Sequence, residues 1–268
     1  MEFAQLSDIG RTRKHNEDYL GYVQPATPAQ TQSHGWLFAV ADGVGGQDRG
    51  EVASRTAVES MLANFGNSAG VESHAALLRR LVQAANHEVY EAGRSASPGG
   101  VAMATTVVAC ALRYDRAVVA HVGDSRCYLI RQGFVTALTR DHTVVAEQLR
   151  LGLISAKEAA ESEKRHVLNR SVGSDLFVNV DISERQVLPG DVLLLCTDGL
   201  HNSVSEADLA QLLAPDVDLN AGDLNAAARG LVALANQRDG GDNITVQLIR
   251  VRSVERMGKY RGRLYTLR

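Results

Sequence analysis

The sequence predicts an α+β fold in which an antiparallel sheet core is flanked by pairs of helices. Segments with the apolar alternation or β-branched composition of strands come in clusters, and turn residues such as Tyr114-Asp115 and Gln132-Gly133 join several of them. Segments with helical spacing of apolar residues come in pairs instead of alternating with single strands. This grouping favours a sheet core with helix pairs over a regular strand–helix alternation.

The expected strands share runs of β-branched and apolar residues bounded by turn residues. They are Phe3–Ile9, Tyr19–Gln24, Trp36–Ala41, Met103–Leu112, Ala117–Val122, Arg126–Arg131, Asp191–Thr197 and Ile244–Val251.

The longer expected helices carry apolar residues three and four positions apart. Two of them span Gly50–Phe65 and His74–Gly93, and another spans Leu224–Gln237. A further helix opens at the capping-box sequence Ser205–Asp208 and continues to Leu213.

The strand pattern stops at about residues 143–173. Two short helices are expected there, Thr143–Leu151 and Ser155–Glu163, with Gly152 between them as a hinge. We interpret this segment as a helical flap inserted into one domain, residues 1–252, where it tunes substrate access.

Residues 253–268 form a basic tail that we expect to be solvated and mobile. The alternative is a docking segment for an acidic partner. Its charged residues are Glu255, Arg256, Lys259, Arg261, Arg263 and Arg268.

Composition narrows the class of protein. With 45% hydrophobic and 22% charged residues the chain of 268 residues has an ordinary globular composition, which excludes disorder as the dominant state. The net charge of −3 argues against a general nucleic-acid binder.

Cysteine spacing and apolar runs bear on location. Cys110, Cys127 and Cys196 form no CxxC pair, which argues against a disulfide framework and a cysteine zinc site and fits a reducing compartment. Met1–Gly10 lacks the pattern of a secretory signal, and Val101–Leu112 is too short to span a bilayer. We therefore expect a cytoplasmic protein with no membrane span.

Carboxylates stand beside the ends of the expected strands. Taken singly, each is explained as turn chemistry, because Asp-Gly is a common hairpin signal. However, Asp42-Gly43 and Asp198-Gly199 each lie between an expected strand and an expected helix, so a hairpin does not explain them. Their glycines suggest that the backbone comes close to a neighbour. The acids are Glu17, Asp18, Asp42, Asp124, Asp198 and Asp242.

Acids that converge at one end of a sheet repel one another. Two charges 4 Å apart cost about 4 kcal/mol at an effective dielectric constant of about 20. Cations relieve this repulsion, and all-oxygen ligands favour Mg²⁺ or Mn²⁺ over zinc. Two such ions can activate a water and hold a phosphoryl group for in-line attack. Arg13, four residues before Glu17, could hold two phosphate oxygens, although alone it would be interpreted as a solvated surface side chain.

Together and in this order, these residues resemble the bacterial branch of the type 2C metal-dependent Ser/Thr protein phosphatases. Each motif alone is weak, but their succession covers nearly the whole domain. The matching segments are Gly10–Asp18, Phe38–Gly46, Ala104–Thr106, His121–Arg126, Thr139–His142, Leu195–Leu200 and Gly241–Thr245.

The resemblance implies a four-layer αββα sandwich, two antiparallel sheets with a helix pair on each outer face. It implies two Mn²⁺ or Mg²⁺ ions. By resemblance, Asp42 bridges both ions, the carbonyl of Gly43 binds one of them, and Asp198 and Asp242 bind the other.

The remaining candidate site residues also come from the resemblance. Glu17 and Asp18 match acids that contact a metal directly or through water. Asp124 matches the acid that helps to hold a third, weaker ion. Arg13 matches the phosphate-binding arginine, so Arg13 and Asp18 are the candidate catalytic residues.

The implied activity is hydrolysis of phosphoserine and phosphothreonine in proteins by direct attack of a metal-bridged hydroxide. The implied partners are phosphorylated proteins and a cognate bacterial Ser/Thr kinase, with the enzyme as a monomer. The alternative is a catalytically silent phosphoprotein-binding module, whose expected sign is loss of the metal-binding acids. A hydrolase of small phosphoesters would need a deep pocket.

Two positions depart from the eukaryotic members. Val44 stands where they carry a histidine proposed as general acid, and Asn202 stands where they carry an aspartate. The first leaves the proton donor to the leaving group unassigned, and the second weakens the expectation of a tight third ion. His166 and His201 could face the site, whereas His121 and His142 are expected to have packing or hydrogen-bonding roles.

Two other motifs were weighed. Gly66–Gly70 matches G-x-S-x-G, but it joins two expected helices and lacks the strand that a nucleophile elbow requires. Gly43–Asp48 fails the last position of the dinucleotide fingerprint.

Overall fold

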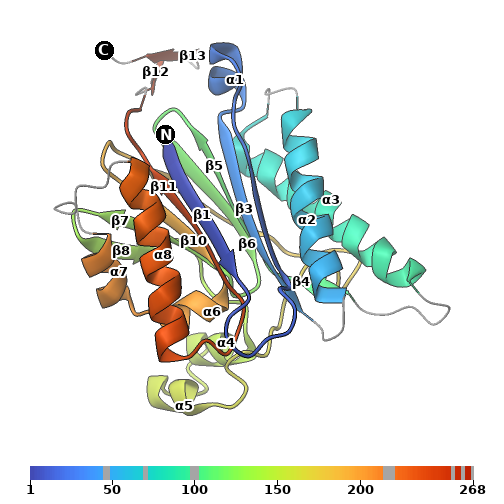
Figure 1. Ribbon diagram of the computed structural model, residues 1–268. Coiled ribbons are helices and arrows are strands. Elements are labelled where there is room, and N and C mark those ends of the chain that lie inside the picture. Colours follow the sequence, from blue (N-terminus) through green and yellow to red (C-terminus); the bar gives the residue numbers. More distant parts are fainter. Residues whose placement is uncertain are drawn as a thin grey trace.

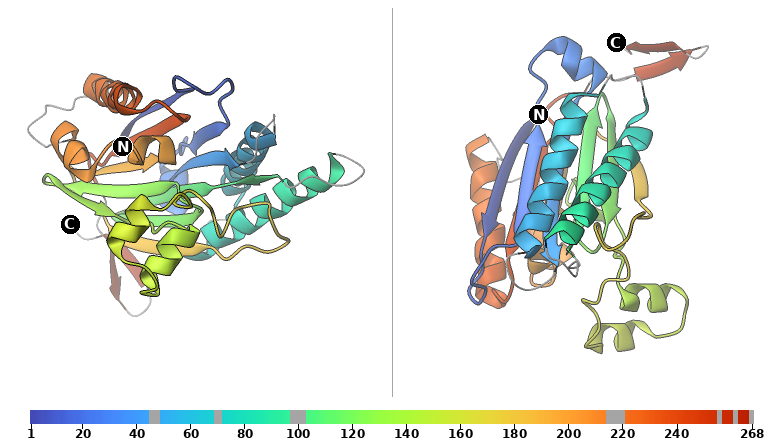
Figure 2. Two further views of the ribbon diagram at one scale, coloured as in Figure 1. Left: turned by 90° about the horizontal axis from the view of Figure 1, so that it is seen from below. Right: turned by 90° about the vertical axis from the view of Figure 1, so that its right-hand side faces the viewer.

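Two antiparallel sheets pack face to face between two layers of helices (Figure 1, Figure 2). The computed structural model describes residues 1–44, 49–68, 72–96, 103–213, 221–254, 257–260 and 263–266. The predicted α+β class and the four-layer αββα arrangement are confirmed.

The first sheet joins the N-terminal strand to the later part of the chain. Its order is β1 (Glu2–Asp8), β11 (Ile244–Arg250), β10 (Val192–Cys196), β7 (Arg126–Arg131) and β8 (Phe134–Ala137).

The second sheet carries the early strands. Its order is β2 (Asp18–Val23), β3 (Trp36–Val44), β5 (Val107–Arg113), β6 (Arg116–Val122) and β9 (Asp181–Gln186), with β4 (Ala104–Thr105) paired to the end of β3.

Helices cover each outer face. On the second sheet lie α2 (Arg49–Gly66) and α3 (His74–Ser95), and on the first lie α7 (Glu206–Leu212) and α8 (Ala221–Arg238). The shorter helices are α1 (Pro28–Ser33), α4 (Val144–Arg150), α5 (Ala156–Glu161) and α6 (Asp198–His201). The capping boxes at Ser155 and Ser205 open α5 and α7 as predicted.

Strand alternation divides the apolar residues among three cores. On β3, Phe38 and Val40 point between the two sheets, whereas Leu37, Ala39 and Ala41 point toward α2 and α3. β10 divides its side chains between the inter-sheet core and the core under α8 in the same way. Because side chains of a strand alternate, a strand buried on both faces is apolar throughout.

The structure corrects several boundaries. β3 runs on through Val44, so the expectation that its strand ends before Asp42 was wrong. The expected strand Met103–Leu112 is divided into β4 and β5 at Thr106. The elements α1, α6, β8 and β9 were not predicted. β9 is a polar edge strand with the sequence DISERQ, which has no apolar alternation to identify it.

The flap lies apart from the sandwich. Helices α4 and α5 project below the ends of the sheets (Figure 2). The two ends of the flap are joined, because Thr143 pairs with Leu168 in an isolated bridge and the N–H of Val144 donates to the Val167 carbonyl at 2.8 Å.

The tail contains a two-stranded hairpin, β12 (Met257–Tyr260) and β13 (Arg263–Thr266). Parts of several predicted segments lie outside the described residues: Gly45–Asp48, Ala69-Gly70, Val101-Ala102, Glu255-Arg256, Arg261 and Arg268. Within the described part of the chain, no helix has the length and apolarity needed to cross a bilayer.

Candidate active site

The predicted site residues meet at one end of the sandwich, near β4 and α6 in Figure 1. They line an open cavity of about 510 Å³. Seven of the eight candidates form its wall, and Asp18 is buried behind it. The wall includes Arg13, Glu17, Asp42, Gly43, Asp124, Asp198 and Asp242.

The pairing of β2 with β3 sets Asp18 directly opposite Asp42. The backbone of Asp42 is held on both sides, because its N–H donates to Thr106 Oγ1 at 2.9 Å and its carbonyl accepts from the Thr106 N–H at 2.8 Å. The Thr105 hydroxyl also donates to that carbonyl at 2.8 Å. Two threonines therefore fix the direction of the Asp42 side chain.

Asp198 enters the cavity as the first residue of α6, directly after β10. The preceding residue, Thr197, donates its hydroxyl to Asp18 Oδ2 at 2.9 Å and accepts the N–H of Thr245 at 3.0 Å. One threonine thus ties both sheets together beneath the acids.

Two glycines allow close backbone approach, as predicted. A Cβ on Gly43 would lie 2.2 Å from the carbonyl oxygen of Gly50, at the start of α2. A Cβ on Gly199 would lie 2.1 Å from the Asn243 carbonyl oxygen. Since real Cβ atoms never come this close, each position excludes a side chain.

Asn243 was missed as an organising residue. Its side-chain oxygen accepts the N–H of Glu17 at 2.8 Å, and its amide donates to the carbonyls of Ile9 and His15. Its position inside the Gly241–Thr245 motif was the available signal. It connects the loop before β2 to the loop before β11.

Arg13 supplies a guanidinium at the rim of the cavity. Its Nη2 donates to Asp242 Oδ2 at 2.8 Å, and its side chain remains 47% exposed. The Asp242 charge and hydrogen bond raise the pKa of Arg13 against the opposing effect of burial.

The carboxyl groups are held away from their ordinary titration range. Burial raises the pKa of Asp18 to about 7, and burial with the charge of Asp198 raises that of Asp124 to about 7. The pKa of Asp42 is raised by burial and then by the charges of Asp18 and Asp198. The pKa of Asp242 is raised chiefly by burial.

Asp198 differs from its neighbours. Burial works to raise its pKa, but hydrogen bonds from His166 and Asp42 and the charge of His201 lower it. The pKa of Asp198 is therefore lowered, whereas the pKa values of Asp18, Asp42, Asp124 and Asp242 are raised.

The acid cluster fits hard divalent cations. Among the described residues, Oδ1 of Asp18 and Oδ1 of Asp198 are buried and have no hydrogen-bond partner. Buried carboxylate oxygens without donors are costly unless a cation takes the place of a donor. The donor atoms are all oxygens, which is the preference of Mg²⁺ and Mn²⁺.

Of the two histidines that could face the site, His166 lines the cavity and His201 lies behind Asp124, outside the cavity wall. His166, from the end of the flap, places Nδ1 3.6 Å from Asp198 Oδ2. His201 contacts the Asp124 carbonyl through Nε2 at 2.9 Å. Asn202 donates to Asp198 Oδ2 at 3.2 Å, and Val44 presents an apolar side chain to the cavity.

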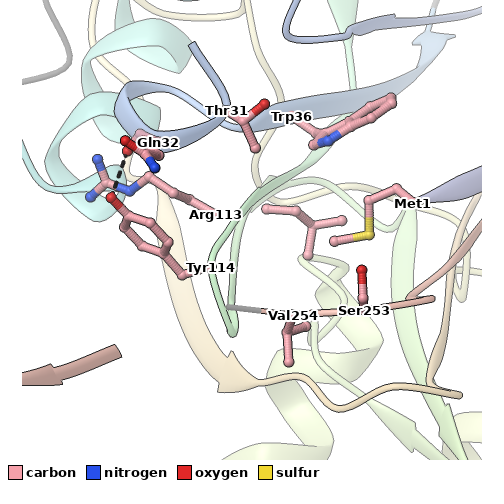
Figure 3. A pocket seen from close by; sticks show the side chains of 9 residues that line it. Met1, Thr31, Gln32, Trp36, Arg113, Tyr114, Ser253 and Val254 are labelled. Carbon is pink, nitrogen blue, oxygen red and sulfur yellow. Dashed lines mark hydrogen bonds between the residues drawn. The ribbon is translucent and has the colours of Figure 1, made fainter. Parts of the chain in front are cut away.

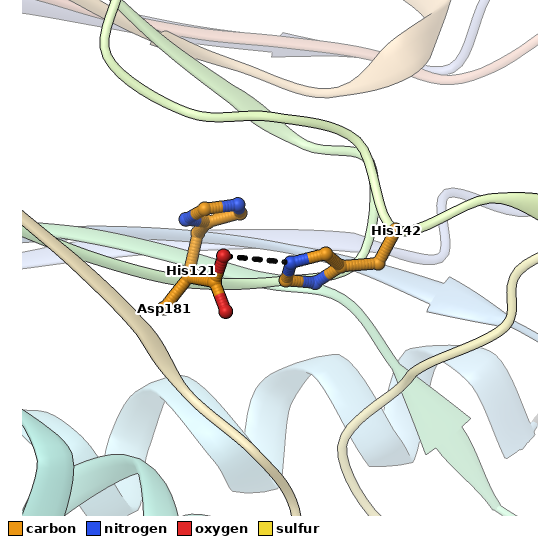
Figure 4. A group of neighbouring side chains, drawn as sticks. All are labelled: His121, His142 and Asp181. Carbon is orange, nitrogen blue, oxygen red and sulfur yellow. Dashed lines mark ion pairs between the residues drawn. The ribbon is translucent and has the colours of Figure 1, made fainter. Parts of the chain in front are cut away.

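A second group with metal-ligand chemistry, His121, His142 and Asp181, lies behind the flap (Figure 4). The guanidinium of Arg170 lies 3.0 Å from His142 Nε2 and 2.8 Å from Asp181 Oδ1. The N–H of Gly123 donates to His142 Nδ1, and His142 Nε2 lies 3.4 Å from Asp181 Oδ2. The guanidinium of Arg170 therefore supplies the positive charge beside Asp181, and the packing role expected for both histidines agrees with this geometry.

A further hollow of about 280 Å³ holds none of the predicted site residues (Figure 3). Met1, Trp36 and Val254 line it, with Arg113 and Tyr114 at its edge. Among the described residues that line it there is no carboxylate, so these residues do not supply the chemistry predicted for the site.

Comparison with known proteins agrees with this geometry. Residues 11–228 match the family model for protein phosphatase 2C. The serine/threonine phosphatase stp of Listeria monocytogenes is 34% identical over 246 residues, which cover 91% of this chain and 93% of that protein. Protein phosphatase PhpP of Streptococcus pneumoniae is 30% identical over 252 residues, 93% of this chain and 97% of that protein.

Solved structures give the same result. The S. agalactiae serine/threonine phosphatase superimposes with a TM-score of 0.82 at 31% identity, covering 93% of this chain and 99% of that one. The catalytic domain of PstP in complex with two manganese ions superimposes with a TM-score of 0.78 at 30% identity, covering 94% and 98%.

The fold and the carboxylate-lined cavity define the class of this protein as a protein-serine/threonine phosphatase. The chain belongs to the protein phosphatase 2C family, which is metal-dependent.

Proposed function

We propose that this chain removes phosphate from phosphoserine and phosphothreonine in proteins with two Mn²⁺ or Mg²⁺ ions at the acid cavity. The observation that carries the proposal is the convergence of separated acids around two buried, partnerless carboxylate oxygens, on Asp18 and Asp198. Repulsion among these acids makes the site costly unless cations bind.

The proposed ligands come from three different parts of the chain. Asp42 and the Gly43 carbonyl come from β3, Asp198 begins α6, and Asp242 precedes β11. Glu17 and Asp124 are proposed to act through water or at a weaker third ion. When bound, the ions supply Lewis acidity to water and neutralise the charge of the phosphoryl group.

The chain's own side chains orient the reaction. Arg13 exchanges part of its contact with Asp242 for two phosphate oxygens, which a planar guanidinium matches. Asp18 is held at Oδ2 by the Thr197 hydroxyl and lies opposite Asp42, so its unpaired Oδ1 is proposed to contact a cation directly or through water.

The flap is proposed to govern access by phosphoproteins. Leu151 and Leu153 are exposed on it, while Val167 and Leu168, at its end, line the cavity. Deleting residues 151–162 should change KM for a phosphoprotein more than kcat on an aryl phosphate. Equal effects on both substrates would contradict this role.

The proposal also covers the domain limits, the cellular location and the partners of the enzyme. Residues 1–252 form the catalytic domain and 253–268 a basic tail. The three cysteines are free and buried, which supports a cytoplasmic location. The proposed partners are phosphorylated proteins and a cognate Ser/Thr kinase, with the enzyme as a monomer.

The decisive experiment measures hydrolysis of p-nitrophenyl phosphate and of a phosphothreonine peptide with Mn²⁺, Mg²⁺ or EDTA. Wild type should turn over both substrates with metal only, and Asp42→Asn should not. Retained phosphopeptide binding without turnover in any metal would favour the silent binding module. A higher kcat/KM on free nucleotides than on the phosphopeptide would favour a small-phosphoester hydrolase.

A further inference from the structure

A second polar pocket, of about 370 Å³, lies on the other side of residues 166–171 from the acid cavity. His166, Leu168 and Ser171 of this segment face the acid cavity, whereas Asn169 and Arg170 face the second pocket. Its wall carries three arginines, Arg140, Arg150 and Arg170. We name it the arginine pocket.

The three arginines come from three places around the flap. Arg140 precedes the flap, Arg150 ends α4 within it, and Arg170 follows α5 on the return to the sandwich. No single element explains why these three guanidinium groups meet. A ligand bound to all of them would tie α4 to both ends of the flap.

The wall is balanced in itself, with Asp141, Glu147 and Asp181 against the three arginines, but Arg126 from outside the wall takes up Asp141 and so leaves one guanidinium in excess. Asp141 is held by Arg126 in a two-bond contact at 2.8 and 2.7 Å, and Glu147 is held by Arg150. Asp181 is held by Arg170 at 2.8 Å. That leaves Arg140, whose contact with Asp181 is 3.6 Å long and whose side chain is 68% exposed.

Two of the three arginines keep N–H groups that make no hydrogen bond to the described residues. Arg170 donates from Nη1 to the Asn179 carbonyl at 3.2 Å and to Asp181 Oδ1 at 2.8 Å, and no hydrogen bond to the described residues leaves from its Nε or Nη2. The hydrogen bonds of Arg150 leave from Nε and Nη2. His142 is neutral at physiological pH because burial lowers its pKa to about 4, so it adds no competing charge.

We propose that the arginine pocket binds a phosphate group that is distinct from the one hydrolysed in the acid cavity. A phosphate group offers acceptor oxygens in several directions. Its negative charge would pair with the guanidinium that has no close carboxylate partner. Its source is either free inorganic phosphate or a second phosphorylated side chain of a bound protein.

The first test measures binding of inorganic phosphate to the full chain by titration calorimetry in EDTA, which requires no turnover. Arg140→Gln should weaken binding about tenfold or more, since a charge-assisted hydrogen bond contributes at least that factor. Arg94→Gln is the matched control, because Arg94 is 66% exposed and makes a similarly long contact of 4.0 Å with Glu91 on α3.

Two further variants locate the binding. Arg13→Gln should keep it, because Arg13 lines the other cavity, and Arg150→Gln should lose it. Wild-type affinity in both Arg140→Gln and Arg150→Gln would overturn the proposal, as would failure of the wild type to bind phosphate.

The second test distinguishes the sources with singly and doubly phosphorylated peptides in Mn²⁺. A KM raised by Arg140→Gln for the doubly phosphorylated peptide alone identifies a phosphorylated side chain. Unchanged KM values for both, with phosphate binding lost, identify free phosphate. Turnover of p-nitrophenyl phosphate by Arg140→Gln should equal that of wild type, so failure of the proposed hydrolysis is detected separately from failure of the arginine pocket.

Discussion

Two charged clusters lie on opposite sides of residues 166–171 and treat their carboxylates in opposite ways. In the acid cavity Asp124 faces other acids, and burial with the Asp198 charge raises its pKa to about 7. Behind the flap, Asp181 faces Arg170 and His142, and these partners lower its pKa despite its partial burial. Burial alone therefore does not identify a functional acid. Asp124 lies among acids that a bound cation would neutralise, whereas Asp181 is already paired with Arg170 and stabilises the fold.

The largest expected effect is on turnover. Asp42→Asn should lower kcat/KM in Mn²⁺ by about a thousandfold or more, equivalent to about 4 kcal/mol, because the neutral amide cannot join two cations. Glu184→Gln, on the exposed part of β9, is the control and should keep wild-type activity. If the activity of Asp42→Asn were within tenfold of that of wild type, Asp42 would not be an essential residue of the acid cavity.

Arg13 is a cationic side chain in the wall of the acid cavity, and its substitution tests whether it binds phosphate. Arg13→Gln should reduce kcat/KM about 10- to 100-fold, the equivalent of one lost charge-assisted contact to phosphate. Arg13→Lys should recover part of the loss, since it restores the charge without the two-bond geometry. Arg55→Gln, exposed on α2, should have no effect; a similar loss there would indicate a general effect of charge.

His142 tests the paired cluster through pH. Its pKa is lowered to about 4, chiefly by burial, so the folded chain prefers the neutral ring. The associated stability is present above about pH 6.5, the ordinary value for histidine, and is lost as the pH falls toward 4. By pH 5 the loss should reach about 2 kcal/mol.

His142→Asn keeps an acceptor for the Gly123 N–H but does not titrate, so urea unfolding should show a shallower fall in stability between pH 7 and pH 5. His87→Asn, exposed on α3, is the control. The same slope in wild type and His142→Asn would show that the neutral ring contributes nothing.

The smallest expected effect separates the two clusters directly, in the metal-free protein at pH 8. Asp42→Asn should raise the free energy of unfolding by about 1 kcal/mol, because it removes one of several repelling charges. Asp181→Asn should lower it by about 1–3 kcal/mol, since Arg170 loses its partner. Thermal unfolding in EDTA would measure the free energy of unfolding of both variants. A lower value for Asp42→Asn than for wild type would disprove the repulsion among the acids of the cavity.

Much of the fold could be predicted because its strands are buried on both faces. β10 is apolar throughout, and β5 and β6 are apolar except for Arg113, Arg116 and His121, so these strands have no polar face that would confuse the assignment. β9 could not be predicted, because an exposed edge strand needs neither alternation nor apolar residues and takes its conformation from its neighbour β6. The short helix α6 spans only four residues directly after β10, which is too short to show a helical pattern in the sequence.

The fold class and the candidate acids follow from the chain alone, since alternation, capping boxes and ordered motifs are local properties of the chain. Which charges meet depends on how the chain folds. The register of β2 and β3 sets Asp18 against Asp42, and the flap's return brings His166 to Asp198 and Arg170 to Asp181. These contacts join residues far apart in the chain, and a carboxylate's energy depends on what surrounds it in space. For that reason no sequence pattern predicted the arginine pocket. Its arginines, Arg140 before the flap and Arg150 and Arg170 within it, are brought together only by the fold.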